Sequence, residues 1–343
     1  MEQSLLDRLL SSARTYLGPV RMVSASDCTL DYAAWNDVTI LRILREHGWK
    51  EGTRIAYLST YSASYTRTET FVALLKRNGI PVDTFIELKR YVRFFFRLFT
   101  IRRRYEFFIV GFRGHEILPF VRLVLGRGKY ILFDAFVSAY DTLCFDRRVF
   151  RPASVVGRFL RWYDRWLCRL ADTVCVDTRA HARSFRDTFG CRNVETLYVD
   201  CNRSLFRRQE PKRGGKTVVL WYGSCLPVQG MEKILRWAKS LESRSDLLFR
   251  FIGPVERTYG KLMTELALMN VECIPWVPYE DLPQIIASAD ICLGGPFGDC
   301  PKASRVIAGK TYQMLACCDR VIVADTEANR EIFRERTTDS SRL

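Results

Sequence analysis

The chain has 343 residues, of which 48% are hydrophobic, and this composition excludes a disordered protein and suits two domains of ordinary size. The 53 Lys and Arg residues outnumber the 38 Asp and Glu residues, so the net charge of +15 favours an anionic partner: nucleic acid, an acidic membrane surface or a phosphorylated substrate. No apolar run reaches the ~18–20 residues that a membrane-spanning helix needs.

The twelve cysteines form no CxxC pair, which argues against a zinc site. Reduced thiols are typical of a cytosolic protein, and the N-terminus lacks the long apolar core of a cleavable signal peptide. We therefore expect a cytoplasmic protein that can bind the inner face of a membrane only peripherally.

In chain order, leucines at helical spacing predict a packing helix over residues 4–17, whereas residues 18–52 show no clear pattern. From Arg54 onward, short apolar runs alternate with helical patterns. The predicted strands are 54–60, 80–86, 107–112, 130–136 and 173–178, and the predicted helices are 68–79, 86–104, 116–126 and 154–170. This alternation predicts a parallel sheet with helices on both faces.

Residues 207–215 are polar, contain Pro and Gly, and are predicted to be a linker. A second alternating series follows it. Its predicted strands are 217–223, 247–253, 271–276, 291–295 and 320–325, and its predicted helices are 231–241, 256–269, 279–288 and one that opens after Gly309. The sequence therefore predicts an N-terminal domain over 1–206, which includes the first helix, and a C-terminal domain over 216–343.

The segment from Ile291 to Cys318 indicates a diphosphate site. A strand runs into a glycine-rich turn, and a basic segment leads to a new helix; the glycines are Gly294, Gly295 and Gly298, and the basic residues are Lys302, Arg305 and Lys310. Glycines let a backbone approach a ligand closely, and a helix N-terminus with nearby cations favours phosphate. The alternative is an ordinary solvated basic face.

This segment resembles the donor-nucleotide motif of the retaining family-4 glycosyltransferases, which have the GT-B fold. The family pattern K-x-x-E-x-x-A matches Lys310, Gln313 and Ala316, with Gln in place of Glu. Further stretches resemble other parts of the family, including a Y-x-R at Tyr65 and Arg67 and a G-x-x-G-H at Gly111 to His115. The similar stretches are 56–82, 108–117, 131–148, 170–185 and 220–235.

The resemblance implies an α/β protein of GT-B architecture, with two Rossmann-like domains whose parallel sheets face a cleft. It implies a hexosyltransferase-type enzyme that transfers a sugar from a nucleotide-sugar donor to a glycan or lipid-linked acceptor with retention of configuration. It also implies that no cofactor or metal is required. Relatives continue beyond the segment that ends near 333, so the C-terminal domain is expected to be shortened, with reduced activity or binding alone as a consequence.

Site residues follow from the same comparison. The resemblance assigns donor diphosphate binding to Gly223, Ser224, Lys302, Arg305 and Lys310, and donor ribose binding to Gln313, which keeps an acceptor oxygen but lacks the charge of Glu. It places His115 near the donor sugar, where it would orient rather than abstract. Tyr65, Arg67 and Asp134 are candidates for contacts with acceptor or cleft, and a capping or loop role is the alternative for Arg67 and Asp134.

Residues 89–105 interleave basic and aromatic side chains. This pattern suits an anionic membrane surface, and a sheet-packing helix with a charged outer face is the alternative. It also gives the best argument for nucleic-acid binding, which we do not expect because no nucleic-acid motif accompanies it. Two other functions stay open: a non-catalytic homologue that binds a nucleotide or a partner, and a basic nucleic-acid-binding protein.

Overall fold

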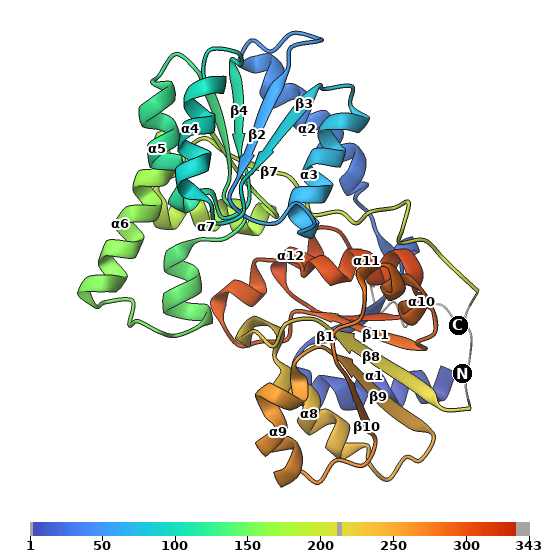
Figure 1. Cartoon of the computed structure of the whole chain (residues 1–343). Helices are drawn as coiled ribbons and strands as arrows, with labels where there is room; N and C mark the ends of the chain where they lie inside the picture. The colour runs from blue at the N-terminus through green and yellow to red at the C-terminus, as the bar shows by residue number, and fades with distance from the viewer. Residues whose placement is uncertain (1–2, 211–214, 334–343) are drawn as a thin grey trace, which may run out of the picture. The chain divides into compact units, whose positions relative to one another are not determined.

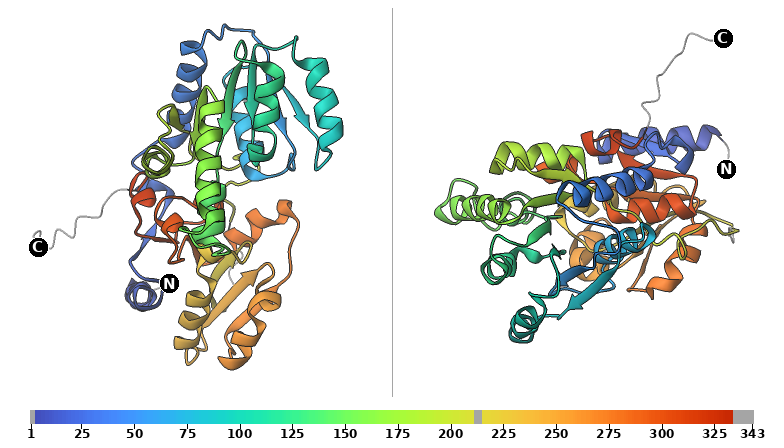
Figure 2. Two further views of the ribbon diagram at one scale, coloured as in Figure 1. Left: turned by 90° about the vertical axis from the view of Figure 1, so that its left-hand side faces the viewer. Right: turned by 90° about the horizontal axis from the view of Figure 1, so that it is seen from above.

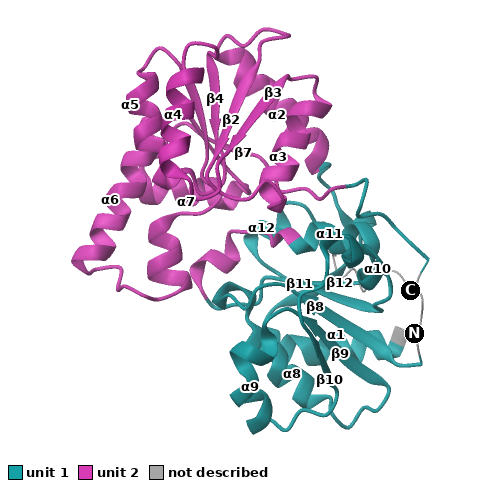
Figure 3. Ribbon diagram, in the orientation of Figure 1, with its two compact units in different colours: residues 1–31, 203–299, 310–343 teal, residues 32–202, 300–309 magenta. Residues whose placement is uncertain are grey.

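The computed structural model describes residues 3–210 and 215–333, which form two compact units. Unit 1 comprises the described residues of Met1–Asp31, Arg203–Asp299 and Lys310–Leu343, and unit 2 comprises Tyr32–Asn202 and Cys300–Gly309 (Figure 3). Neither unit is a single continuous segment of the chain.

Unit 2 is built on a parallel sheet. Its strands among the described residues, in spatial order, are β3 (Val82–Ile86), β2 (Ile55–Ser59), β4 (Phe107–Val110), β5 (Tyr130–Asp134), β6 (Thr173–Val176) and β7 (Val194–Thr196) (Figure 1). Every neighbouring pair is parallel. Such strands are covered on both faces, and this explains why they read as continuous apolar runs.

Helices cover both faces of this sheet. Ile55 and Tyr57 pack with α2 (Tyr32–Glu46) and α3 (Thr66–Arg77), whereas Ala56 and Leu58 face the other way. On that second face lie α4 (Tyr91–Ile101), α5 (Leu118–Leu125), α6 (Val155–Leu170) and α7 (Arg179–Phe189). Figure 2, left, shows α4, α5 and α6 side by side. Two short helices, η2 (Gly114–Glu116) and η3 (Asp141–Asp146), lie in the connections.

Unit 1 is built on a mixed sheet. Its strands among the described residues, in spatial order, are β1 (Val20–Val23), β12 (Val321–Ala324), β11 (Ile291–Gly295), β8 (Thr217–Tyr222), β9 (Leu247–Ile252) and β10 (Val271–Ile274). All pairs are parallel except β1 with β12, which is antiparallel. The predicted α/β class with two Rossmann-like parallel sheets is confirmed.

Helices also cover both faces of the unit 1 sheet. One face packs on α1 (Gln3–Leu17), α8 (Met231–Ser240) and α9 (Val255–Glu265), and Figure 1 shows α10 (Leu282–Ala287) and α11 (Gly309–Cys317) on the other. The remaining helices are η1 (Ala25–Asp27), η4 (Pro227–Gln229), η5 (Tyr279–Asp281), η6 (Pro301–Ser304) and α12 (Glu327–Arg330). In the part of the chain that is described, none of the helices has the length and apolar character needed to cross a bilayer.

The N-terminal segment differs from expectation. The sequence analysis placed residues 1–31 in the N-terminal domain, but they join unit 1. The apolar stripe of α1, with Leu9 and Ala13 at its centre, is buried in the same core as α8, and β1 extends the sheet at β12. Partner choice here depends on apolar surface from distant parts of the chain, which proximity in sequence does not reveal.

Two other boundaries also differ. The C-terminal unit resumes at Arg203, within the predicted N-terminal domain and before the predicted linker, of which residues 211–214 lie outside the described part. The Cys300–Gly309 segment belongs to unit 2, although its neighbours on both sides belong to unit 1. The predicted polar tail after residue 333 also lies outside the described residues.

We predict that Leu9→Ala destabilises the protein by about 2–5 kcal/mol, because it leaves a cavity in the core that α1 and α8 share. Chemical denaturation monitored by circular dichroism would measure the change. The control is Val38→Ala on α2, where the side chain is exposed and little effect is expected. Equal stability of both variants would contradict the packing of α1.

Candidate functional site

The sheet topology locates one candidate crevice in each unit. In a parallel sheet, ligands bind outside the carboxyl ends of the strands, where the strand order reverses. In unit 1 the order reverses between β8 and β11, and in unit 2 it reverses between β2 and β4. We therefore expect functional residues in the loops that follow these four strands.

In unit 1 the glycine loops after β8 and β11 pack against each other. Gly298 N donates to Val228 O at 3.0 Å, and a Cβ at Gly230 would lie 2.6 Å from Phe297 O. Gly230 and Gly298 are therefore required for close packing of backbone on backbone. Gly223 differs: its φ of +140° needs glycine, and its nearest neighbours on the Cβ side are Trp221 atoms at 3.9 Å. Gly223 is thus required for its backbone conformation and not for close packing.

Lys310 lies in the first turn of α11 and is buried, with 8% of its surface exposed. Its Nζ lies 4.3 Å from the centroid of the Trp221 ring and has no hydrogen-bond partner. Burial lowers the pKa of Lys310 well below its ordinary value of 10.5. A buried amine without an acceptor, at the start of a helix, has the chemistry to take up a proton and pair with an anion.

Gln313 lies one turn further along α11 and is 4% exposed. Its Oε1 accepts a hydrogen bond from the Tyr222 hydroxyl at 2.7 Å, and its Nε2 donates to the Tyr279 hydroxyl at 3.2 Å. Both ends of the amide are therefore bonded within unit 1. The sequence analysis did not single out Tyr222 or Tyr279, although Tyr222 ends a strand at the reversal point of the sheet.

Lys302 and Arg305 belong to unit 2, whereas Gly223, Ser224 and Lys310 belong to unit 1. Arg305 Nη2 donates to both carboxylate oxygens of Asp141 at 2.8 Å, and Nη1 contacts Ser184. Lys302 Nζ lies 3.8 Å from Asp146 Oδ2. These two cations thus pair with the carboxylates at the ends of η3. Their predicted diphosphate role stays a prediction.

Arg67 and Asp134 form a buried ion pair in unit 2. Asp134 ends β5, and Arg67 reaches it from the first turn of α3, with its Nε and Nη2 at 2.8–3.1 Å from the carboxylate oxygens. Its Nη1 donates to Leu197 O at 2.7 Å. Burial opposes the charge on Arg67, but Asp134 raises the pKa of the guanidinium overall. The pair holds α3, β5 and the end of β7 together.

Aromatic rings gather near this pair, beyond β2 and β4. The Tyr65 ring stacks on Phe112 at 4.1 Å, and Tyr61 contacts both rings edge to face. Arg67 lies over Phe136, 5.5 Å from its centroid. The structure brings Tyr65, Arg67 and Asp134 together, and their contact with an acceptor stays a prediction. The sequence analysis did not single out Phe112 or Phe136.

His115 lies in η2, just after β4. Its Nε2 is 4.0 Å from Asp164 Oδ1, and its ring meets Phe133 edge to face at 5.2 Å. Burial lowers the pKa of His115, so the imidazole is neutral at pH 7. A neutral, packed imidazole can orient a neighbour by a hydrogen bond. The glycines of the G-x-x-G-H segment have packing roles, since a Cβ at Gly111 or Gly114 would collide with Tyr57 or Val110.

A second buried acid–histidine pair follows β6. His181 Nδ1 lies 2.6 Å from Asp177 Oδ1, both residues are buried, and Asp177 Oδ2 has no hydrogen-bond partner. Neither residue was a site candidate in the sequence analysis. The position of Asp177 directly after a strand was the available signal, because carboxyl ends of parallel strands meet at one edge.

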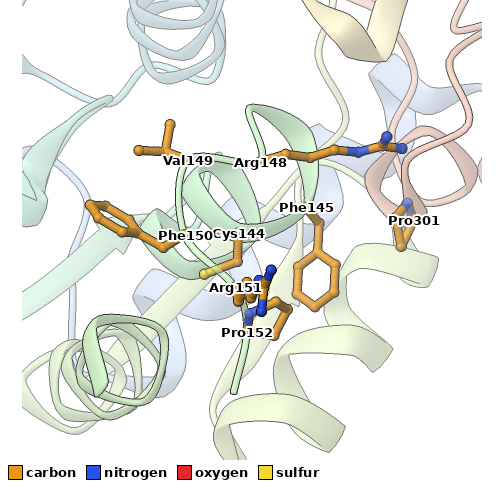
Figure 4. A pocket seen from close by; sticks show the side chains of 8 residues that line it. All are labelled: Cys144, Phe145, Arg148, Val149, Phe150, Arg151, Pro152 and Pro301. Carbon is orange, nitrogen blue, oxygen red and sulfur yellow. The ribbon is translucent and has the colours of Figure 1, made fainter. Parts of the chain in front are cut away.

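A recess of about 470 Å³ opens in unit 2 beside η3. Arg148 and Arg151 line it together with Phe145 and Phe150 (Figure 4), and its other lining residues are Cys144, Val149, Pro152 and Pro301. Within the described residues, no cluster of three or more His, Cys, Asp or Glu side chains could hold a metal ion. The expected independence from metal stays a prediction.

Residues 202–338 match the protein family described as Glycosyl transferases group 1. The match covers less than half of the chain and includes the predicted donor residues, whereas His115 and the Arg67–Asp134 pair lie outside it. It supports a glycosyltransferase domain of the GT-B superfamily in this part of the chain. A comparison with curated protein sequences found no significant match.

Three similar solved structures are a complex of an S. aureus TarM variant with fondaparinux, α-GlcNAc-glycerol and UDP, the lipopolysaccharide outer core galactosyltransferase WaaB, and a candidate UDP-N-acetylglucosamine 2-epimerase from Listeria monocytogenes. Identities are 13%, 11% and 11%, and TM-scores are 0.42, 0.42 and 0.41. The alignments cover 54%, 72% and 70% of this chain and 36%, 76% and 73% of the other chains. At these scores the likeness carries no argument about function, and this chain spans little more than a third of TarM.

We predict that the stability conferred by Lys310 rises with pH. Between its lowered pKa in the folded protein and the ordinary value of 10.5, the unfolded chain binds a proton that the folded chain lacks. Relative to Lys310→Met, the wild-type protein should gain up to about 1.4 kcal/mol per pH unit in that interval. Denaturant titrations at a series of alkaline pH values would measure this, and parallel pH curves for the two proteins would contradict it.

We predict that Asp134→Asn destabilises unit 2 by about 3–5 kcal/mol, because it leaves the buried Arg67 guanidinium without its counter-charge. Arg67→Met and Asp134→Leu made together should reduce the free energy of unfolding by less than the sum of the reductions that the same two substitutions cause singly. Asp246→Asn removes an exposed pair with Arg244 and serves as a control with little expected change. Additive losses in the double variant would show that the pair does not act as a unit.

Proposed function

We propose that this protein is a retaining glycosyltransferase that moves a sugar from a nucleotide-sugar donor to a glycan or lipid-linked acceptor. The observation that carries the proposal is that the family match over residues 202–338 includes the point between β8 and β11 where the strand order reverses. There, the loop after β8 opens with Gly223 in a conformation that needs glycine, and Lys310 supplies an amine that lacks an acceptor.

Donor binding is the step that unit 1 supports. The leaving group of a nucleotide sugar is a diphosphate, whose oxygens gain charge as the glycosidic bond breaks. Lys310 would take up a proton on diphosphate binding and stabilise that charge at the start of α11. The exposed Ser224 and the backbone beside Gly223 would complete the phosphate contacts. The phosphate-binding role of Lys302 and Arg305 in unit 2, which pair with Asp146 and Asp141, remains part of the proposal.

In unit 2, His115 and nearby aromatic rings have the chemistry to orient a sugar or an acceptor. In a retaining reaction on one face of the sugar, the leaving phosphate can accept the acceptor's proton, so His115 needs only to orient a hydroxyl. Its neutral, packed imidazole suits that role. The Tyr61, Tyr65 and Phe112 rings at the sheet edge suit the apolar face of a sugar ring.

A second candidate function is binding of a nucleotide without turnover. The observation that favours it is Gln313, which stands where the resembled family has Glu and whose amide is already bonded to Tyr222 and Tyr279. A ribose would have to displace these bonds to reach Gln313. A protein that lacks the ribose-binding carboxylate could still bind a diphosphate weakly through Lys310 alone.

We predict that UDP or GDP raises the melting temperature of the wild-type protein and that Lys310→Met weakens this affinity about tenfold or more, because a charge-assisted phosphate contact is lost. Thermal-shift titrations would measure the affinity. Lys261→Met, an exposed change on α9, is the matched control. No shift with either nucleotide or its sugars would count against both candidate functions.

Turnover separates the two candidates. Release of free nucleoside diphosphate from UDP- or GDP-sugars, with or without added glycan or lipid-linked acceptors, would be followed by coupled assay. Nucleotide binding with no release from any donor would favour the binding protein. Release that Lys310→Met abolishes and Lys261→Met preserves would favour the enzyme.

A further inference from the structure

Exposed apolar side chains are concentrated on one part of unit 2. Among the described residues, twelve of the sixteen exposed large hydrophobic residues lie between Leu88 and Trp162. They are Leu88, Tyr91, Val92, Phe96, Phe99, Leu123, Val149, Phe150, Val155, Val156, Phe159 and Trp162. Single exposed apolar residues are ordinary on soluble proteins, but a group of this size marks an interaction surface.

The helices that carry these residues each have two apolar faces. In α4, Phe94, Leu98 and Ile101 are buried against the sheet. Its exposed residues Val92, Phe96 and Phe99 follow the same helical spacing on another face, and Phe96 is 72% exposed. A helix that only covers a sheet needs one apolar stripe.

In α6, Leu167 and Cys168 are buried and Val155, Phe159 and Trp162 form an exposed stripe. Trp162 is 57% exposed and stacks on Trp166 with parallel ring planes. The second stripe of α6 is as regular as that of α4. Its apolar character therefore has no explanation in the packing of unit 2.

The two stripes lie on neighbouring helices. Helix α5 packs between α4 and α6: Phe120 contacts Phe95 of α4 at 4.0 Å, and Arg122 donates to Leu170 O at the end of α6 at 2.6 Å. On its outer side α5 presents Leu123, which is 79% exposed. Figure 2, left, shows the three helices side by side on one face of the sheet. We refer to their outer side as the α4–α6 face.

The charge on the α4–α6 face is almost entirely positive. Helices α4 and α5 contain no acidic residue, and the one acid of α6, Asp164, is buried and accepts hydrogen bonds from Ser138 and Tyr140. The arginines in and just after these helices are Arg93, Arg97, Arg102, Arg103, Arg104, Arg122, Arg127, Arg158, Arg161, Arg165 and Arg169. Two of them form ion pairs with acids outside the helices, Arg93 with Glu87 and Arg122 with Asp172. Two more guanidiniums, Arg148 and Arg151, line the recess just before α6.

We propose that the α4–α6 face binds the surface of an anionic lipid bilayer. Phe96, Phe159 and Trp162 would insert among the acyl chains near the headgroups, and the surrounding arginines would pair with headgroup phosphates. The proposal does not depend on glycosyl transfer. It extends the expectation from residues 89–105 to a composite surface in which α6 contributes the larger aromatic side chains.

Charge and side-chain type favour a bilayer over other partners. A second copy of the chain would bring two strongly basic faces together, which like-charge repulsion opposes. Nucleic acid would pair with the arginines, but it offers no partner for the aliphatic side chains Val92, Leu123 and Val155. An anionic bilayer complements both the charge and the apolar side chains of this face.

The test is flotation of the full chain with vesicles of phosphatidylcholine alone or of an equal mixture with phosphatidylglycerol. We expect binding to the anionic vesicles that falls as salt is added. The variant Phe96→Ser/Phe159→Ser/Trp162→Ser should bind roughly tenfold or more weakly. Its matched control is Tyr16→Ser/Val38→Ser/Met269→Ser, three exposed apolar residues elsewhere, which should bind like wild type.

A charge series makes the test independent of the apolar variant. Arg103→Gln/Arg158→Gln/Arg165→Gln should weaken binding to anionic vesicles, whereas Lys50→Gln/Arg257→Gln/Lys261→Gln, also exposed, should weaken it much less. All these side chains are exposed, so unchanged melting temperatures are expected for every variant. Vesicle binding that neither α4–α6 variant reduces would overturn the proposal. So would a concentration-dependent dimer, or binding to RNA, that the α4–α6 variants abolish in a protein with no vesicle affinity.

Discussion

The electrostatic state of Lys310 is the constraint on which the interpretation of unit 1 depends. The Lys310 side chain is buried beside Trp221, and its amine has no hydrogen-bond acceptor. Burial disfavours the charged form of this amine. The amine lies where the strand order reverses between β8 and β11 and where α11 begins. An anion bound there would pair with both the amine and the N-terminus of α11.

Unit 2 solves its buried charges differently. Arg67 meets Asp134 and Arg305 meets Asp141, so these two guanidiniums have carboxylate partners within the unit, and the His181 ring contacts Asp177. These pairs join elements that are far apart in sequence and fix the loops at the carboxyl edge of the sheet. On its outer helices α4, α5 and α6 the same unit carries many more arginines than acidic residues. Buried charge therefore sets the geometry of the edge, while exposed charge determines what the outer face can attract.

The sequence predicted the parts of this fold that local pattern controls. Alternating apolar runs located β2 to β6 and β8 to β12 because parallel strands covered on both faces are continuously apolar. Lys310 followed from the new helix after the glycine-rich turn, whereas Gly223 came only from the family resemblance. Tertiary packing controlled the rest. Strand β1 pairs with β12 from the other end of the chain, and two tyrosines bond the Gln313 amide. Gly230 and Gly298 allow the loops after β8 and β11 to pack backbone on backbone. No local pattern encodes such partners.

The segment Cys300–Gly309 has a consequence for how the chain is divided. The backbone changes unit after Asp31, after Asn202, after Asp299 and after Gly309. A single cut in the region 207–215 would therefore leave two fragments that each contain pieces of both units. Neither unit corresponds to one continuous stretch of sequence. A gene fragment with a single start and a single stop therefore cannot encode either unit without also encoding part of the other or omitting part of its own.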